Sequence, residues 1–148
     1  MFNVVLIEPE IPPNTGNIGR LCLATGSTLH LVKPLGFSID DRELKRAGLD
    51  YWKDVEVRLW ESFADLEQAR EPDAGLFFLT TKSDRAYYDV NFRPGDFLVF
   101  GRETKGLSEA LLAANAKHLL TIPMQGTRSL NLATAVAIVL FEAMRQQR

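Results

Sequence analysis

The stretch Ile122–Arg148, IPMQGTRSLNLATAVAIVLFEAMRQQR, decides how this chain folds. It starts with the end of an expected strand and continues through a polar loop, Gln125–Asn131. From Leu132 onward it has the pattern of a helix with apolar residues on almost every side. A helix without a polar face must be covered on several sides. We therefore expect the loop to hold a small molecule and the helix to hold a second copy of the protein.

The composition is that of an ordinary globular domain. The chain has 148 residues, of which 46% are hydrophobic and 24% charged, and its net charge is -2. These values predict a single domain over residues 1–148 and give no bulk attraction to nucleic acid, so any RNA contact needs a local patch. The single cysteine, Cys22, excludes an internal disulfide and fits a reducing compartment. The N-terminus, MFNVVLIEPE, lacks signal-peptide features, and we expect a cytoplasmic protein that does not cross a membrane.

Short apolar runs alternate with helical patterns along the chain. The runs that we predict to be strands are Phe2–Ile7, Leu29–Val32, Val55–Leu59, Gly75–Thr80, Asp96–Phe100 and Leu119–Ile122. The segments that we predict to be helices are Thr15 up to Gly26, Asp40–Ala47, Ser62–Arg70, Ser108–Ala114 and a last helix from Leu132. This alternation predicts an α/β fold with a mostly parallel sheet and helices on both faces.

Two segments between these elements are predicted to lack regular structure. Glu8–Asn14 contains three prolines, and Thr81–Pro94 is polar. In parallel sheets, ligands bind beyond the carboxyl ends of the strands. Three loops that follow strands carry suitable side chains there: Glu8–Gly19, Gly101–Ser108 and Pro123–Asn131.

The first loop contains NTGNIGR, residues Asn14–Arg20. Gly16 and Gly19 allow a ligand to approach the backbone closely, and the start of the helix favours an anionic oxygen. Arg20 is placed to reach a phosphate or a developing oxyanion. The alternative interpretation is an Asn-Thr helix cap followed by a surface arginine.

The other two loops are equally ambiguous when each is taken alone. Phe100–Ser108, FGRETKGLS, offers backbone amides to a purine or a carboxylate, or it is a solvated turn with a Glu–Lys pair. It is not a Walker loop, because the required spacing is absent. In the third loop, Ser129 and Asn131 are two residues apart and point the same way in an extended segment. Alternatively, both cap the helix that follows.

Several other kinds of site are disfavoured. His30 and His118 have no second ligand at metal-binding spacing, so we expect no metal site. Cys22 falls on the apolar side of the first expected helix, where a packing role is favoured over a nucleophilic one. The loop after the first strand lacks the G-x-G-x-x-G fingerprint of a dinucleotide site, and the second strand ends in Lys33 rather than an acidic residue.

Taken together, the three loops resemble the motifs of the SpoU branch of the SPOUT methyltransferases. The matching fragments are NTGNIGR (Asn14–Arg20), FGRETKGLS (Phe100–Ser108) and IPM…RSLNLATAVAI (Ile122–Ile138). They occur in the right order, each after a strand, and the resemblance covers essentially the whole chain. EPEIPPNTGN (Glu8–Asn17) and RAGLDYW (Arg46–Trp52) are similar to the small subfamily that methylates the ribose of the tRNA wobble nucleotide.

The resemblance implies more than the residues alone. It implies an α/β fold with a deep C-terminal trefoil knot that holds S-adenosylmethionine. It also implies a homodimer, joined in our reading through the C-terminal helix, whose active site takes residues from both chains. By position, the implied cofactor contacts are Leu79, Thr80, Gly101, Ile122, Ser129 and Leu130. The implied catalytic residue is Arg20, with supporting polar residues at Asn14, Glu103, Ser129 and Asn131.

The implied reaction moves a methyl group to the 2′-hydroxyl of the wobble nucleotide, a cytidine or a modified uridine, in the anticodon loop. A ribose hydroxyl is a poor nucleophile, so alignment supplies a large part of the rate. Because arginine does not readily lose its proton in a protein, we expect Arg20 to stabilise alkoxide character and to anchor the neighbouring phosphate. A phosphate oxygen, or alternatively Glu103, then accepts the proton. Relatives carry a tyrosine where this chain has Phe141, so we assign Phe141 no catalytic role.

An acidic chain needs local groups to hold RNA. The basic candidates are Arg20, Arg42, Lys45, Arg46, Lys82, Arg85, Arg102 and Arg128. The candidates for stacking on bases are Tyr51, Trp52, Tyr87 and Tyr88. Three alternatives remain: a SpoU-type enzyme for another tRNA or rRNA ribose, a catalytically idle RNA-binding module on the same fold, and a nucleotide-dependent oxidoreductase.

Overall fold

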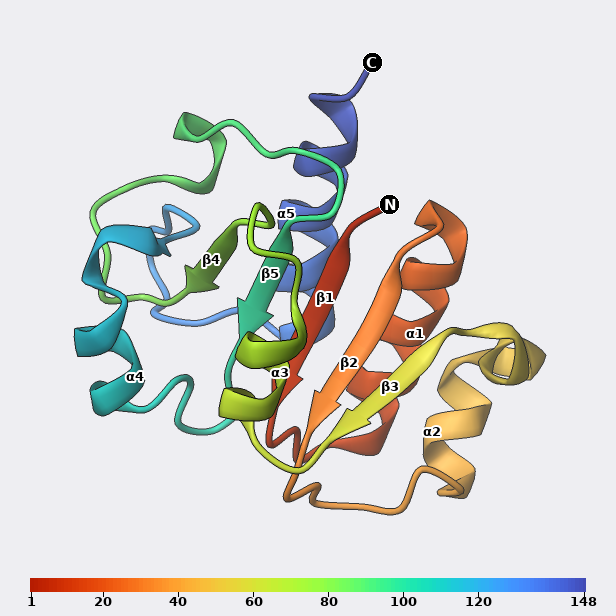
Figure 1. Cartoon of the computed structure of the whole chain (residues 1–148). Helices are drawn as coiled ribbons and strands as arrows, with labels where there is room; N and C mark the ends of the chain where they lie inside the picture. The colour runs from red at the N-terminus through yellow and green to blue at the C-terminus, as the bar shows by residue number, and fades with distance from the viewer.

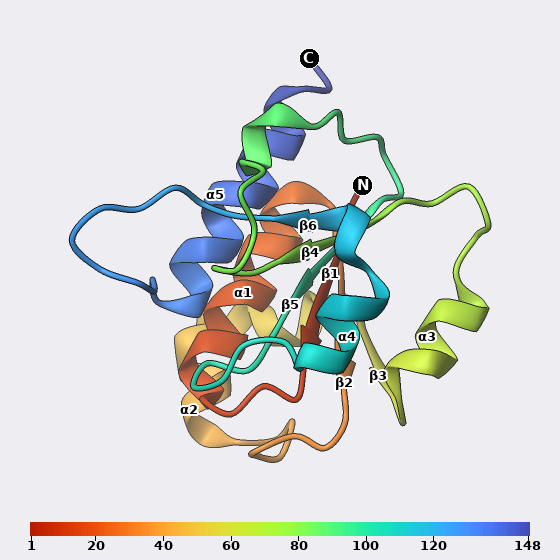
Figure 2. The same ribbon diagram turned by 90° about the vertical axis from the view of Figure 1, so that its left-hand side faces the viewer.

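Six parallel strands form one sheet in the order β3-β2-β1-β5-β4-β6 (Figure 1 shows β1 to β5, and Figure 2 shows β6 beside β4). The strands are β1 (Asn3–Ile7), β2 (Thr28–Val32), β3 (Val57–Trp60), β4 (Leu76–Leu79), β5 (Phe97–Phe100) and β6 (Leu119–Leu120). This computed structural model describes the backbone of residues 1–148 and all side chains except those of residues 49 and 50. The predicted parallel sheet is confirmed.

Helices cover both faces of the sheet, as predicted (Figure 2). They are α1 (Pro12–Thr25), α2 (Arg42–Ala47), α3 (Phe63–Ala69), α4 (Glu109–Ala114) and α5 (Leu132–Arg145). Helices α1 and α5 lie on one face with α2 packed against α1, and α3 and α4 lie on the other. Short 3-10 turns cover Leu49–Asp54, Tyr87–Asp89 and Ala116–His118.

The strand β1 shows how the core is divided between the two faces. Successive side chains of a strand point to opposite sides. Val4 and Leu6 therefore pack in the core cluster that contains residues of α1 and α5. Val5, between them, packs in the cluster that contains Leu66 of α3 and Leu112 of α4. All three β1 side chains are fully buried, which explains why this strand is an unbroken apolar run rather than an alternating one.

The first helix starts earlier than the sequence predicted. We expected Glu8–Asn14 to lack regular structure, but α1 begins at Pro12, so that Pro12 and Pro13 occupy its first turn. Proline is tolerated there because the first amides of a helix have no carbonyl partner within the helix, and its fixed φ suits the helix. The predicted end of the helix is confirmed: Gly26 has φ 64° and its amide bonds back to the last turn.

Most of the other boundaries agree with the predictions. Asp41, Ser62 and Ser108 cap α2, α3 and α4 through side-chain oxygens that accept backbone amides. The last strand is shorter than expected, because β6 ends at Leu120. The expected loop at Thr81–Pro94 contains the turn at Tyr87–Asp89 and a parallel bridge to the chain beyond β6, so it is more ordered than its composition indicated.

The C-terminal helix α5 is covered on one side only within the chain. Its buried residues are Val136, Val139, Leu140 and Ala143. On the opposite side Phe141 is 48% exposed. No helix among the described residues has the length and apolar character needed to cross a bilayer. The all-round apolar pattern of this helix therefore leaves one face without a partner inside the monomer.

Candidate active site

A cavity of about 250 Å³ lies at the carboxyl ends of β4, β5 and β6. These three strands are neighbours in the sheet, so the loops that follow them meet at one edge. The cavity lining includes all six residues expected to contact a cofactor: Leu79, Thr80, Gly101, Ile122, Ser129 and Leu130. The residues that the family resemblance grouped as cofactor contacts thus lie around one cavity in the tertiary structure.

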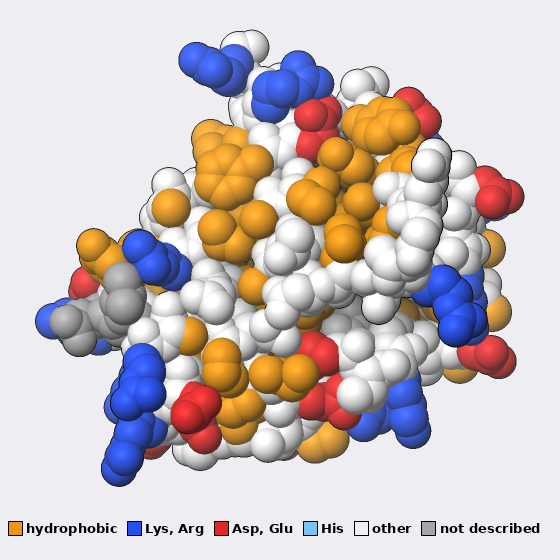
Figure 3. All heavy atoms as spheres, turned by 180° about the vertical axis from the view of Figure 1, so that it is seen from behind, with side chains coloured by type: hydrophobic (Ala, Val, Ile, Leu, Met, Phe, Trp, Pro, Cys, Tyr) orange, Lys and Arg blue, Asp and Glu red, His pale blue; other side chains and the backbone are white. Residues whose placement is uncertain are grey.

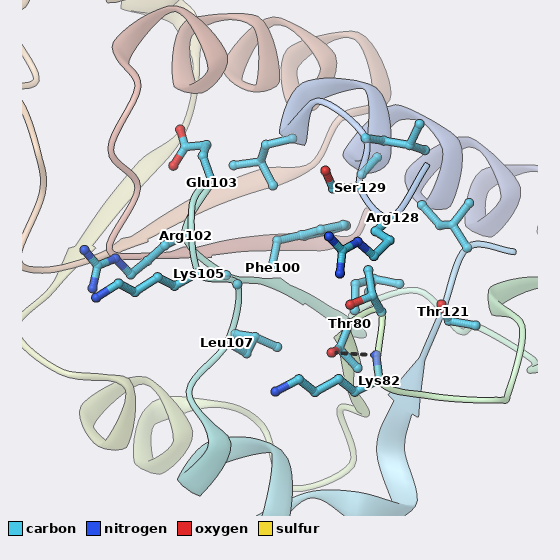
Figure 4. A pocket seen from close by; sticks show the side chains of 18 of the residues that line it. Thr80, Lys82, Phe100, Arg102, Glu103, Lys105, Leu107, Thr121, Arg128 and Ser129 are labelled. Carbon is cyan, nitrogen blue, oxygen red and sulfur yellow. Dashed lines mark hydrogen bonds between the residues drawn. The ribbon is translucent and has the colours of Figure 1, made fainter. Parts of the chain in front are cut away.

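Polar side chains from two of these loops face the cavity (Figure 4). The Ser129 hydroxyl and the Arg128 guanidinium point into the space beside Phe100 and Thr80. The hydroxyl of Thr80 accepts a hydrogen bond from the amide of Lys82 at 3.1 Å, which turns the chain away from the end of β4. The site therefore combines an apolar floor with a few polar groups, as is usual in small-molecule sites.

The wall formed by the second loop is one tight turn. The amide of Arg102 donates to the carbonyl of Gly106 at 3.2 Å, and the amide of Gly106 donates to the carbonyl of Arg102 at 2.8 Å. Gly106 has φ 66°, a left-handed conformation that glycine adopts without strain. A Cβ on Gly101 would lie 2.2 Å from the carbonyl carbon of Gly106. Only glycine fits at position 101, so the two glycines fix the shape of this wall.

Glu103, at the tip of this turn, joins it to the start of α1. Its carboxylate accepts hydrogen bonds from the amides of Glu10 and Ile11, both at 2.8 Å, and from the side-chain amide of Asn14 at 3.4 Å. The N-cap residue Ile11 has no side-chain acceptor to offer the helix. Asn14 lies inside the first turn and does not cap the helix, so the Asn-Thr cap considered for this loop is not formed. Glu103 instead supplies acceptors to the amides that precede the helix.

Asn14 also connects to the third loop. The side-chain amide of Asn131 donates to Oδ1 of Asn14 at 3.0 Å. Oδ1 of Asn131 accepts the amide of Thr134 and so caps α5. Asn131, and not Ser129, is therefore the cap. Three of the candidate catalytic residues form one hydrogen-bonded chain, Glu103–Asn14–Asn131, beside the cavity.

Arg20 lies apart from this chain of side chains. It is an exposed residue of α1, and its guanidinium carbon lies 5.7 Å from the centre of the Tyr51 ring, a cation–π distance. It is not part of the cavity lining. The structure thus brings together the cofactor residues and the polar network, but it leaves the expected catalytic arginine outside the pocket of its own chain.

One further residue beside the site, Glu10, was not predicted from the sequence. Glu10 accepts from the amide and hydroxyl of Thr104 and from Arg102. Those contacts hold the pKa of the Glu10 carboxyl below its ordinary value, the Thr104 amide having the largest effect and the Thr104 hydroxyl the next. Arg128 belongs to the loop that the sequence predicts to hold a small molecule, and it lines the cavity. The sequence signal that could have identified Glu10 was the pair of acidic residues in EPE, Glu8 and Glu10, directly after the first strand.

The residues judged unsuited to catalysis have packing roles. His30 is buried, with Trp60 donating to Nδ1 at 2.9 Å and Nε2 2.8 Å from Oδ1 of Asn3. Burial, with a smaller effect of Arg58, lowers the pKa of His30 to about 4. Burial raises the pKa of the Cys22 thiol to about 12, which makes it unreactive. Among the described residues, no group of three His, Cys, Asp or Glu side chains is arranged around a common metal position.

Comparison with known proteins agrees with this geometry. A model of the SpoU rRNA Methylase family matches residues 1–141. A tRNA (cytidine(34)-2′-O)-methyltransferase of Burkholderia pseudomallei is 50% identical over 149 residues, covering 99% of this chain and 96% of its own. A structure that concerns 2′-OH methylation of C/U34 on tRNA superposes with a TM-score of 0.95 at 47% identity, covering 99% of this chain and 96% of that one. An AdoMet-bound rRNA methyltransferase of Sinorhizobium meliloti superposes with a TM-score of 0.87 at 27% identity, covering 99% of this chain and 57% of that one.

Proposed function

The chain belongs to the SpoU rRNA Methylase family, and on that basis we propose that it transfers a methyl group from S-adenosylmethionine to the 2′-hydroxyl of the wobble nucleotide of tRNA. The observation that carries the proposal is that two motif loops, Gly101–Ser108 and Pro123–Asn131, meet the end of β4 at one cavity. The remaining motif loop, at the start of α1, does not line the cavity but is hydrogen-bonded to both of them through Glu103 and Asn131. The named relative acts on cytidine 34, and the named structure concerns C/U34. Because the substrate is tRNA, we place the reaction in the cytoplasm.

The cavity has the features that S-adenosylmethionine requires. The cofactor supplies an electrophilic methyl group on a positively charged sulfur. Gly101, which tolerates no Cβ, exposes backbone at the cavity wall, and such backbone groups hydrogen-bond an adenine edge. Leu79, Ile122 and Leu130 provide an apolar surface for its ring, and the nearby Ser129 hydroxyl offers a polar contact. The side chains therefore suit a ligand with one flat apolar part and several polar groups.

The catalytic group is Arg20, and in this proposal it comes from the partner subunit. Arg20 lies outside the pocket lining of its own chain and is exposed at the surface. A guanidinium stays protonated, so its task is to stabilise negative charge on the ribose oxygen and to anchor the neighbouring phosphate. A phosphate oxygen is the favoured proton acceptor, because both oxygens of Glu103 already accept backbone amides.

The proposed dimer forms through the uncovered face of α5. At helical spacing, Thr134, Ala137, Ile138 and Phe141 lie opposite the buried side of this helix. Figure 3 shows hydrophobic side chains gathered on the face of the molecule that carries α1 and α5. A second copy packed there would cover Phe141, which is 48% exposed. A symmetric dimer is the simplest assembly that presents the same patch twice.

We further propose that the C-terminal segment is threaded into a trefoil knot. The support is the contact of residues 85–92 with both ends of that segment. The amide of Tyr87 donates to the carbonyl of Thr121, and the amide of Thr121 donates to the carbonyl of Arg85. At the far end, Gln146 accepts from the amide of Phe92 and donates to the carbonyl of Val90. Figures 1 and 2 show the connection between β4 and β5 running close beside α5.

The RNA surface combines two groups of basic side chains. Lys82, Arg102 and Arg128 lie at the cavity, whereas Arg20 lies on α1 beside Tyr51. Tyr51 is exposed and suited to stacking on an unpaired base. Trp52 is not, because its ring packs against Gly19, where an added Cβ would lie 2.7 Å away. Arg42, Lys45 and Arg46 add positive charge on α2, next to α1.

Nucleoside mass spectrometry tests the proposed reaction. The purified protein is incubated with tRNA and with S-adenosylmethionine that carries an isotope-labelled methyl group. The expected product is a labelled 2′-O-methyl group at the wobble nucleotide. Product at another ribose would assign a different RNA target to the same enzyme class. Failure to bind the cofactor in a direct titration would overturn the proposed activity as a whole.

A further inference from the structure

Two acidic residues, Glu10 and Glu103, hold each other's loops. The carboxylate of Glu103 accepts the backbone amide of Glu10 itself at 2.8 Å. In return, Oε1 of Glu10 accepts the backbone amide of Thr104 at 3.0 Å and its hydroxyl at 2.8 Å. Oε2 of Glu10 accepts from Arg102 at 3.2 Å. Glu103 therefore binds the backbone amide of Glu10, and Glu10 binds the backbone amide of the residue that follows Glu103.

We propose that Glu10 is a positioning residue for the cofactor pocket, acting through this reciprocal pair of contacts, which we call the carboxylate clamp (Glu10, Arg102, Glu103 and Thr104). The inference rests on the proposed function, because it assumes that the cavity holds S-adenosylmethionine. Glu10 itself does not line the cavity, whereas Arg102, Glu103 and Thr104 all do. Its effect on the cofactor must pass through the turn that it holds.

The turn needs such an anchor because its own bonds fix its shape and not its place. Arg102 and Gly106 close the turn through two backbone hydrogen bonds. Those bonds lie entirely within residues 102–106, so they allow the turn to tilt as a unit about its two ends. The contacts of Glu10 with Thr104 and Arg102 reach the middle of the turn from a loop 92–94 residues away in the chain. That cross-link sets the angle of the cavity wall.

Charge makes the contacts of Glu10 stronger than those of a neutral acceptor. The carboxylate is partly buried, and its Oε2 is ion-paired with Nη2 of Arg102 at 3.2 Å. Hydrogen bonds to an ionised group are stronger than neutral ones. In addition, Glu103 is hydrogen-bonded to Asn14, which in turn is hydrogen-bonded to Asn131, the cap of α5. The clamp therefore ties the loop Gly101–Ser108 to the loop Glu8–Gly19. The bond between Asn14 and Asn131 ties Glu8–Gly19 in turn to the loop Pro123–Asn131.

The test uses graded substitutions at Glu10 with calorimetric titration of S-adenosylmethionine. Glu10→Gln keeps an oxygen for Thr104 but loses the ion pair with Arg102, whereas Glu10→Ala loses both contacts. We expect the cofactor dissociation constant to rise about tenfold for Glu10→Ala and less for Glu10→Gln. At saturating cofactor, kcat should stay within about twofold of the original enzyme, because no reacting group has been removed. Glu67→Gln, an exposed acid on α3, is the matched control and should change neither quantity.

A second substitution separates positioning from general destabilisation. Thr104→Val removes the hydroxyl contact from the other side and should weaken cofactor binding in the same direction. If both act through one clamp, the double variant Glu10→Ala/Thr104→Val should bind no more weakly than Glu10→Ala alone. Unchanged cofactor affinity in Glu10→Ala, or simple addition of the two effects, would overturn the clamp. Failure of the original protein to bind S-adenosylmethionine would instead overturn the proposed function, so the two failures are distinguishable.

Discussion

The side-chain amide of Asn131 donates a hydrogen bond of 3.0 Å to Oδ1 of Asn14, joining residues 117 positions apart. One residue thereby links the start of α5 to the start of α1, because Oδ1 of Asn131 also caps α5. On its other side, the amide of Asn14 reaches Glu103. The polar network next to the cavity thus depends on both asparagines being amides.

Asn131→Asp should separate the cap from the network. An aspartate oxygen still accepts the amide of Thr134, so α5 stays capped. The network fails, because Asn14 cannot turn its amide toward both the introduced carboxylate and Glu103. We expect kcat to fall about tenfold, the equivalent of one lost hydrogen bond, with the melting temperature nearly unchanged. Asn131→Ala is the comparison: it should also lose about 1 kcal/mol of folding stability with the cap. Equal activity in Asn131→Asp and the original protein would contradict the role of the network.

Substitution of Arg20 should remove catalysis and spare the cofactor. Arg20 lies outside the pocket lining of its own chain, so S-adenosylmethionine should bind Arg20→Ala with unchanged affinity. The rate of methyl transfer should fall by about a hundredfold or more, the usual loss for an electrostatic stabiliser. Arg20→Lys keeps the charge without the planar fork and should recover only a small part of the rate. Arg58→Lys, on the edge strand β3, serves as control. Near-full turnover by Arg20→Lys with unchanged RNA binding would refute bidentate anchoring.

Gly101→Ala should close the cofactor site. The new Cβ would lie 2.2 Å from the carbonyl carbon of Gly106, a backbone atom that moves only with the whole turn. A strain of about 1–3 kcal/mol should raise the cofactor dissociation constant roughly ten- to a hundredfold, as measured by titration calorimetry. Gly26→Ala is the control, because its Cβ meets nothing within 4 Å and its φ of 64° affects only the end of α1. That variant should lose some stability and no cofactor affinity.

Phe141→Glu should dissociate the proposed dimer. Phe141 is exposed in the monomer, so a charged side chain there does not disturb the core, but it places a charge in the α5 interface. Analytical ultracentrifugation should show a monomer with unchanged circular dichroism and with cofactor-dependent methylation lost. Leu59→Glu adds the same charge at an exposed apolar position on β3 and should remain dimeric. A Phe141→Glu protein that stays dimeric and active would place the interface elsewhere.

Acid should destabilise the protein through His30. Its pKa is lowered from 6.5 to about 4 in the folded chain, so between these values the unfolded chain binds the extra proton. The free energy of unfolding is therefore highest above about pH 6.5 and falls by up to about 3 kcal/mol as the pH drops to about 4. Urea titrations across this range measure the slope. His30→Gln should flatten it, because glutamine does not titrate. A slope that is the same in both proteins would assign the effect to other groups.

The local features of the fold could be predicted from the sequence because their causes are local. The caps of α2, α3 and α4 are Asp41, Ser62 and Ser108, and each accepts backbone amides only two or three residues further along the chain. The strands are marked by apolar runs. The start of α1 was missed because prolines that interrupt a helix in its interior are tolerated in its first turn. The six lining residues expected to contact the cofactor followed from the family resemblance. The rule that ligands bind beyond strand ends pointed to the loops after β1, β5 and β6, and only the last two of these line the cavity.

Only the tertiary structure decided which side chains within those loops touch each other. The sequence motifs grouped Asn14, Glu103 and Asn131 but assigned none of them a partner. The register of β1 against β5 brings Glu10 beside Thr104, and the docking of α5 against α1 brings Asn131 to Asn14. Such pairings depend on the angle between whole elements, which no local pattern encodes. The apolar pattern of the C-terminal stretch Ile122–Arg148 therefore determined that α5 must be covered on several sides. The fold determined which of those sides is covered by the rest of the same chain.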